Sequence, residues 1–168
     1  MLDTYTVSFF GHRMIDNIPK VEEQVEEIVR NLIHEKQYVE FLVGRDGDFD
    51  QIVASTVRRV KHAVRDDNSV LVWVMPYPKA EYEDNTESFD SYYDEVEVCQ
   101  ESCSAHFKAA IAIRNNSMIE RSDLVVAYVE RKSGGAYRAL EYAEKTNNKI
   151  INIAESRDVK VRFLGHRV

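Results

Sequence analysis

Glycines and charged or polar side chains follow three short apolar runs of this sequence, at the point where each run ends. These residues are Gly11, His12 and Arg13 after the first run, Gly44–Asp48 after the second, and Ser133, Gly134 and Gly135 after the run at 123–129. Glycine lets backbone N–H groups approach an anion closely, and the N-terminus of a following helix adds about half a positive charge. If the runs are parallel strands, their carboxyl ends meet at one edge of a sheet. The pattern then predicts a pocket for a small anion such as phosphate.

Each of these turns also has a simpler interpretation, because a glycine after a strand is most often an ordinary turn residue. The glycine spacing matches neither the dinucleotide fingerprint G-x-G-x-x-G nor the phosphate-loop motif G-x-x-x-x-G-K-[ST]. The coincidence of three such turns favours an anion pocket, but these residues alone leave both interpretations open.

Arg114 lies on the apolar stripe of a helix that the spacing predicts over 102–120. Phe107 and Met118 belong to the same stripe. A guanidinium there must be paired or must reach a polar cavity, because a buried unpaired charge is prohibitive. It would either pair with a nearby carboxylate for structural reasons or clamp a phosphate or carboxylate of a ligand. Asn115 beside it is a poor residue for the middle of a helix, and such a conflict tends to mark function or strain.

Cys99, Cys103 and His106 are spaced at i, i+4 and i+7, which would put them on one side of a helix. Three ligands without an evident fourth match a zinc site poorly. Free cysteines are often buried as small apolar residues, so packing against the sheet is the favoured interpretation. We therefore expect no metal and no bound cofactor.

Short apolar runs alternate with longer amphipathic stretches along the chain. The predicted strands cover about 5–10, 41–43, 70–75, 95–98, 123–129 and 149–153. The predicted helices cover about 19–33, 52–60, 102–120 and 134–146. The run at 70–75 is apolar throughout, which is typical of a central strand buried on both faces. The alternation predicts one α/β domain over 1–168 with a mostly parallel sheet.

Two segments depart from this rhythm. Residues 79–94 carry six acidic and four aromatic side chains, and we expect an acidic-aromatic loop there. It would be either a solvated surface loop or a mobile lid that closes over a ligand. Residues 156–168 form a polar tail, in which Gly165–Arg167 repeats the Gly-His-Arg sequence of the first turn without a following helix pattern.

Composition limits the classes of partner. With 22 Lys and Arg against 29 Asp and Glu, the 168-residue chain has a net charge of −7, which argues against binding nucleic acid along its phosphate backbone. No apolar run reaches the length of a membrane span, and Met1–Phe10 has no signal-peptide pattern. Two cysteines are too few for a secreted disulfide framework. We expect a soluble cytoplasmic protein, and its amphipathic helices leave room for a homo-oligomer.

Three blocks of the sequence resemble a known superfamily. Gly11-His12-Arg13 resembles the opening of the YpsA-like branch of the SLOG superfamily, which is named after DNA-processing protein A (Smf) and the LOG phosphoribohydrolases. The second block, Gly44-x-x-Gly47-x-x-Asp50, resembles the second glycine turn of that branch. The third block resembles the LOG motifs, with Arg114-Asn115-Asn-Ser-Met, then Asp123 and an apolar strand, then Ser133-Gly134-Gly135 and Glu141.

The resemblance implies a Rossmann-like three-layer α/β/α sandwich that binds a nucleotide or a nucleotide-derived ligand over these turns. It implies catalytic roles for Arg114 and Glu141, which match the arginine and glutamate that cleave an N-glycosidic bond in LOG enzymes. Ser133, Tyr137 and Arg138 depart from the LOG motif, where proline, glycine and threonine stand. The bulk of Tyr137 puts a LOG-like substrate pose in doubt.

The preferred hypothesis is a binding module for a small phosphorylated nucleotide-type ligand. The alternative is an enzyme, a hydrolase or transferase acting on the N-glycosidic bond of a nucleotide, so the sequence leaves open whether the protein is catalytic. DNA binding of the Smf kind ranks last because of the negative charge. We expect four arginines to gather at the sheet edge, namely Arg13, Arg45, Arg114 and Arg138.

Overall fold

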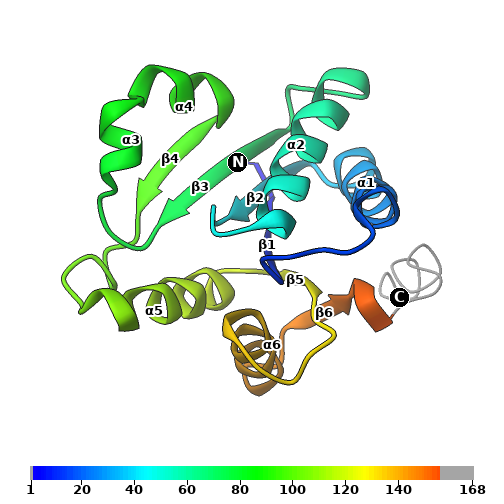
Figure 1. The fold of residues 1–168 in the computed structure, drawn as a ribbon. Coiled ribbons are helices and arrows are strands. Elements are labelled where there is room, and N and C mark those ends of the chain that lie inside the picture. The colour runs from blue at the N-terminus through cyan, green and yellow to red at the C-terminus, as the bar shows by residue number, and fades with distance from the viewer. Residues whose placement is uncertain (1, 156–168) are drawn as a thin grey trace.

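Six parallel strands form one sheet in the computed structural model, which describes residues 2–155 (Figure 1). The strands are β1 (Thr4–Gly11), β2 (Tyr38–Val43), β3 (Ser69–Met75), β4 (Glu95–Val98), β5 (Leu124–Tyr128) and β6 (Lys149–Asn152). Their order across the sheet is β4-β3-β2-β1-β5-β6. The predicted mostly parallel sheet is confirmed.

Helices cover both faces of the sheet and make the fold a three-layer α/β/α sandwich (Figure 1). The helices are α1 (Ile18–Glu35), α2 (Asp48–Ala63), α3 (Ala80–Asp84), α4 (Thr86–Tyr92), α5 (Phe107–Glu120) and α6 (Gly135–Lys145), and a 3₁₀ turn, η1, covers Ile153–Glu155. Helices α1 to α4 lie on one face, and α5 and α6 lie on the other. The Rossmann-like fold class is confirmed. Within residues 2–155, no helix combines the length and the apolar character that crossing a membrane requires.

The side chains of β3 pack into the hydrophobic cores on both faces of the sheet. All seven of its residues are buried, and they alternate between the two faces. Leu71, Trp73 and Met75 join the core under α1 and α2, whereas Val70, Val72 and Val74 join the core on the α5 and α6 face. A strand buried on both faces reads as a continuous apolar run, which is why the sequence located it clearly.

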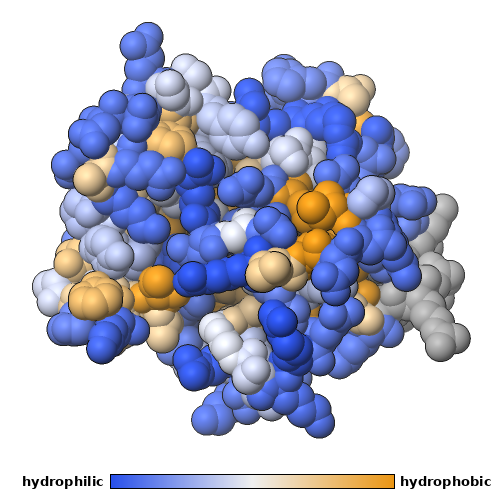
Figure 2. Space-filling view, in the orientation of Figure 1, coloured by the Kyte–Doolittle hydropathy of each residue, from blue (hydrophilic) through white to orange (hydrophobic). Residues whose placement is uncertain are grey.

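The segment 79–94 is structured, and the prediction of a long loop is wrong. It forms α3 and α4, whose aromatic side chains pack around the buried indole of Trp73. The ring centroids of Tyr82, Phe89 and Tyr93 lie 5.9, 5.0 and 5.3 Å from that of Trp73. The acidic side chains of α3 and α4 are exposed, and Figure 2 shows a mainly hydrophilic surface over these helices. Sequence periodicity missed these two helices because each is shorter than the stretch of about 11 residues over which a helical repeat can be recognised.

Helix α5 begins at Phe107, five residues later than predicted, because turns occupy residues 100–105. Phe107 is 61% exposed, so the prediction that it lies on the buried stripe is wrong. Cys99 is buried as expected, but Cys103 is exposed, and neither lies on a helix with His106. No group of three or more metal-ligating side chains occurs among residues 2–155. The predicted tail at 156–168, with its second Gly-His-Arg, lies outside the described residues.

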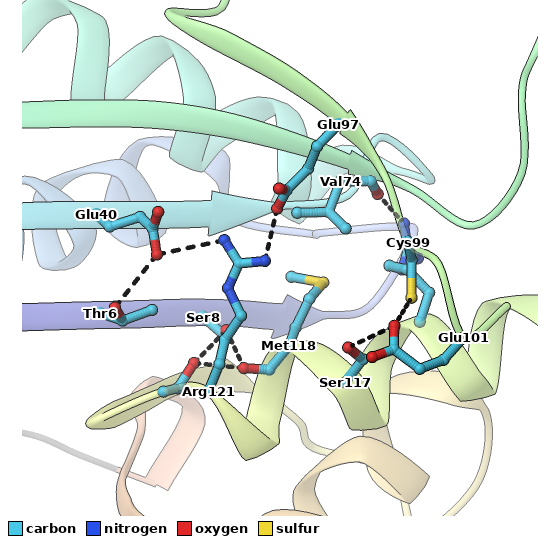
Figure 3. A network of polar contacts seen from close by, with 12 residues as sticks. Thr6, Ser8, Glu40, Val74, Glu97, Cys99, Glu101, Ser117, Met118 and Arg121 are labelled. Carbon is cyan, nitrogen blue, oxygen red and sulfur yellow. Dashed lines mark hydrogen bonds and ion pairs between the residues drawn. The ribbon is translucent and has the colours of Figure 1, made fainter. Parts of the chain in front are cut away.

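Arg121 ties the end of α5 to the sheet (Figure 3). Its guanidinium lies 3.3 Å from Glu40 on β2 and 2.7 Å from Glu97 on β4. Glu40 also accepts a hydrogen bond from Thr6 on β1. One side chain thus links α5 to a polar network that includes three strands and fixes the helix that carries Arg114 and Asn115.

Candidate functional site

A cavity of about 530 Å³ lies at the carboxyl ends of the central strands. The strand order reverses beside β1, which pairs with β2 on one side and β5 on the other. Open parallel sheets bind ligands in the crevice at such a reversal. The side chains and turns that line it are Phe9, Phe10, Gly11, His12, Arg13, Gly44, Asp46, Gly47, Asp50, Ile111, Arg114, Asn115, Arg131, Ser133, Gly134, Gly135 and Ala136.

The structure brings together the ten residues that the sequence suggested for ligand binding, and Arg114 with them. The ten are Gly11, His12, Arg13, Gly44, Gly47, Asp50, Asn115, Ser133, Gly134 and Gly135, and all of them line the cavity. Glu141 is different, because it is exposed on α6 and is not part of this lining. We therefore assign it no contact with a ligand in the cavity.

Only two of the four arginines expected at the sheet edge gather there. Arg13 and Arg114 line the cavity, whereas Arg138 is exposed on α6 outside it. Arg45 turns toward α3 and α4, where it lies 3.3 Å from Glu81 and stacks over Phe89 at 4.9 Å.

Asp46 was named among the residues after the second strand but was not assigned to the ligand site, and Arg131 was not singled out from the sequence. Each follows a strand by only a few residues, so the rule that selected their neighbours for the site applies to both. Arg131 places at the cavity the positive charge that the sequence analysis expected from Arg138.

Arg114 is buried and fully engaged by the protein. It is 3% exposed, and Nη2 donates to Asp46 Oδ2 at 2.8 Å. Nη1 donates to the Val74 carbonyl at 2.8 Å, and Nε donates to Asn115 Oδ1 at 2.9 Å. Of the two interpretations left open by the sequence, these contacts favour the structural ion pair. The guanidinium holds the β2–α2 turn against β3 and α5.

Two carboxyl groups stand on the β2–α2 side of the cavity and differ in charge. Burial alone would raise the pKa of Asp46, but Arg114, Lys79 and Arg13 together hold it below the ordinary value. Burial raises the pKa of Asp50 to about 6, and the negative charge of Asp46 adds to this effect. Asp46 is therefore the ionised partner of Arg114, and Asp50 is the group that titrates near neutrality.

The glycines at the first two turns are needed for packing. A Cβ on Gly11 would lie 2.2 Å from the ring of Phe49, and a Cβ on Gly47 would lie 2.4 Å from the Cα of Arg13. The second contact lets the β1–α1 and β2–α2 connections cross closely, and the Asp48 N–H donates to the Arg13 carbonyl at 2.8 Å. These two glycines bring neighbouring elements together, which does not require an anion.

The third glycine turn is open. Gly134 has φ of +91°, a conformation that L side chains rarely adopt, and it precedes α6 without a side-chain cap. A Cβ on Gly134 or on Gly135 would meet no atom within 4 Å. The first N–H groups of α6 therefore lie at an open turn that lines the cavity.

His12 shapes this turn from β1. It is buried, and its Nε2 accepts hydrogen bonds from the backbone N–H groups of Glu130 at 2.9 Å and Arg131 at 3.3 Å. Burial, with the charge of Arg131, lowers the pKa of His12 below its ordinary value. A neutral imidazole that accepts from two N–H groups is a scaffold for the β5–α6 connection.

Arg13 and Arg131 are the positive charges at the cavity that no acid neutralises directly. Both are exposed, and among residues 2–155 neither forms an ion pair. They come from the β1–α1 and β5–α6 connections, on either side of the strand reversal. The cavity therefore has a basic part near α6, with Arg131, and a carboxyl part near α2, with Asp46 and Asp50. Arg13 lies next to Gly47, on the side of the carboxyl part.

Solved structures with this architecture include DNA processing protein A from Streptococcus pneumoniae, with a TM-score of 0.67 and 12% identity. The match covers 98% of this chain and 57% of that one, so the chain spans little more than half of that protein's length. DNA processing protein A from Helicobacter pylori, described for its single-stranded DNA binding, has a TM-score of 0.61 and 13% identity over 96% of this chain and 72% of that one. The molybdenum cofactor carrier protein of Chlamydomonas reinhardtii has a TM-score of 0.60 and 12% identity over 98% and 86%.

These likenesses define the class of fold. The chain has a Rossmann-like fold that it shares with DNA processing protein A and the molybdenum cofactor carrier protein, and the expected fold is confirmed. No protein-family model matches the sequence, and no curated protein matches it significantly.

Proposed function

We propose that this protein binds a small phosphorylated ligand of the nucleotide type, with the phosphate at the N-terminus of α6. The observation that carries the proposal is the open turn at Gly134 and Gly135, which follows the unpaired charge of Arg131 and lines the same cavity as Arg13. Free N–H groups at a helix start, with about half a positive charge from the helix dipole, attract phosphate oxygens. Two arginines add donors whose planar fork matches phosphate geometry.

Arg114 has a positioning role in this proposal. Its guanidinium already donates hydrogen bonds to Asp46, Val74 and Asn115. It would therefore support the cavity wall, while the phosphate lies at the N-terminus of α6. This differs from the clamp that its place on the helix first suggested.

A compact ligand suits the cavity and the charge of the molecule better than a polymer does. The solved proteins of this fold include binders of single-stranded DNA and carriers of a cofactor. A net charge of −7 opposes a long polyanion, whereas two arginines and one helix start match a single phosphate group. We therefore propose a mononucleotide or a similar ligand for this chain.

Isothermal titration with AMP, GMP, CMP and UMP tests the proposal, with Arg131→Ala as the diagnostic variant. We expect at least one mononucleotide to bind, and Arg131→Ala to weaken its binding about tenfold or more through the loss of a charge-assisted hydrogen bond. Arg138→Ala is the matched control, because Arg138 is exposed on α6 outside the cavity. No binding of any mononucleotide, or equal losses in the two variants, would overturn the proposal.

Cleavage of an N-glycosidic bond is the second candidate, and one observation favours it. Asp50 lines the cavity with a pKa of about 6, and a carboxyl group that titrates near neutrality can act as a general acid or base. Chromatography for free base after incubation with each mononucleotide tests this activity. Equal turnover by Asp50→Asn and the wild type would remove Asp50 from the reaction.

A further inference from the structure

The carboxyl part of the cavity holds an acceptor and a donor that the protein itself leaves unused. Asp50 Oδ2 accepts the Asp46 N–H at 2.9 Å, and no group among residues 2–155 donates to its Oδ1. Asn115 is 9% exposed, and its Nδ2 donates to no residue in the same range. Both residues line the cavity.

The orientation of the Asn115 amide is set by its neighbour. Arg114 Nε can only donate, so the atom 2.9 Å from it is the amide oxygen and the NH₂ group is the free end. The same guanidinium bonds Asp46, whose N–H bonds Asp50. Asn115, Arg114, Asp46 and Asp50 thus form one continuous chain of hydrogen bonds, and its two ends offer a free donor and a free acceptor to the cavity.

A hydroxyl group complements such a pair, because it donates one hydrogen bond and accepts others. A phosphate dianion has no proton to offer a carboxylate, and the like charges repel each other. A divalent cation would need several oxygen ligands, but the carboxylate of Asp46 already serves Arg114 at 2.8 Å. This part of the cavity therefore matches an uncharged, hydroxyl-bearing group of the ligand.

We propose that Asp50 and Asn115 bind the sugar hydroxyls of the ligand, so that the cavity selects ribonucleotides over deoxyribonucleotides. This inference rests on the proposed phosphate site, because the phosphate at α6 would direct the sugar toward the β2–α2 turn. The cavity of about 530 Å³ is in the range of pockets that hold ligands of this size.

The test compares AMP, 2′-deoxy-AMP and 3′-deoxy-AMP by isothermal titration, with inorganic phosphate as a competitor. We expect the loss of one of the two hydroxyls to weaken binding about tenfold or more, since a carboxylate enclosed in the cavity then loses its donor. In Asp50→Asn and Asn115→Ala, the preference for AMP should fall severalfold, while inorganic phosphate competes as in the wild type. A merely structural defect would weaken all the nucleotides equally and leave the preference unchanged.

Glu141→Gln is the control, because Glu141 is exposed outside the cavity and should keep the wild-type preference. Equal binding of AMP and both deoxy forms by the wild type would overturn this inference and leave the phosphate site standing. A preference that survives in both variants, or that appears only with added Mg²⁺, would overturn it too. Failure of every phosphorylated probe to bind would remove the proposed function together with this inference.

Discussion

Asp50 is the residue whose ionisation links the cavity to the stability of the fold. Burial raises its pKa from 3.8 to about 6 in the folded protein. A folded-state pKa above the unfolded value means that the protonated carboxyl stabilises the fold. This contribution is complete below pH 3.8 and is lost as the pH rises to 6. Near neutral pH the half-buried Asp50 carboxylate therefore lowers the free energy of unfolding.

Asp50→Asn should raise the free energy of unfolding by up to about 3 kcal/mol near pH 8, because about two pKa units correspond to that amount. The gain should shrink below pH 6 and vanish only below pH 3.8, where both states of the wild type become protonated. Asparagine keeps an oxygen that can accept the Asp46 N–H. Urea unfolding across this pH range measures the effect, with Glu141→Gln as the control. A stability difference that is independent of pH would argue against the titration of Asp50.

At the scale of elements, α3 and α4 form a wall that depends on aromatic packing. Neither helix buries a residue fully, and neither has a side-chain cap. Phe89 lies against Trp73 at 5.0 Å and under Arg45 at 4.9 Å. Helices this short are marginal by themselves, so these contacts hold them against β3.

Phe89→Ala should lower the free energy of unfolding by about 2 kcal/mol, less than for a fully buried phenylalanine because Phe89 is partly exposed. It should also speed proteolytic cleavage within 80–94, since the wall loses its central ring. Phe107→Ala is a matched control, because Phe107 is 61% exposed and its loss should change stability by less than about 0.5 kcal/mol. Equal losses in the two variants would show that the aromatic cluster does not hold α3 and α4.

At the scale of the whole molecule, acidic side chains are spread over the surface, whereas two unpaired arginines line the cavity. The exposed acids of 79–94 lie on α3 and α4, whereas Arg13 and Arg131 lie beside the strand reversal. A polyanion would need a longer basic surface, since each phosphate contact releases counterions only where a Lys or Arg replaces them.

A single-stranded oligonucleotide of about 20 residues should bind no more tightly than its mononucleotide, and with a shallow dependence on salt, because about two arginines contact phosphate. Fluorescence anisotropy between about 50 and 200 mM salt measures both quantities. The slope of log affinity against log salt concentration gives the number of phosphate contacts. A slope that corresponds to about five or more contacts would favour DNA binding over a small ligand.

Local chemistry explains why so much of the cavity could be predicted. Glycines and polar side chains after apolar runs mark the carboxyl ends of parallel strands, and the fold brings those ends together. Gly11, Gly44 and Gly134 therefore reached one cavity as predicted. The same rule, applied to every polar residue after a strand, would have included Asp46 and Arg131.

The sequence by itself determined the succession of the six strands and of the four longer helices, the buried character of β3 and the identity of the turns that meet, because these depend on neighbours along the chain. Only the tertiary structure decided what those residues do. Arg114 meets Asp46 from 68 positions away, which makes it a support where spacing allowed a clamp. Glu141 faces solvent and Arg45 faces an aromatic wall. Charge pairing and burial are set by distances between elements, and no local pattern encodes those distances.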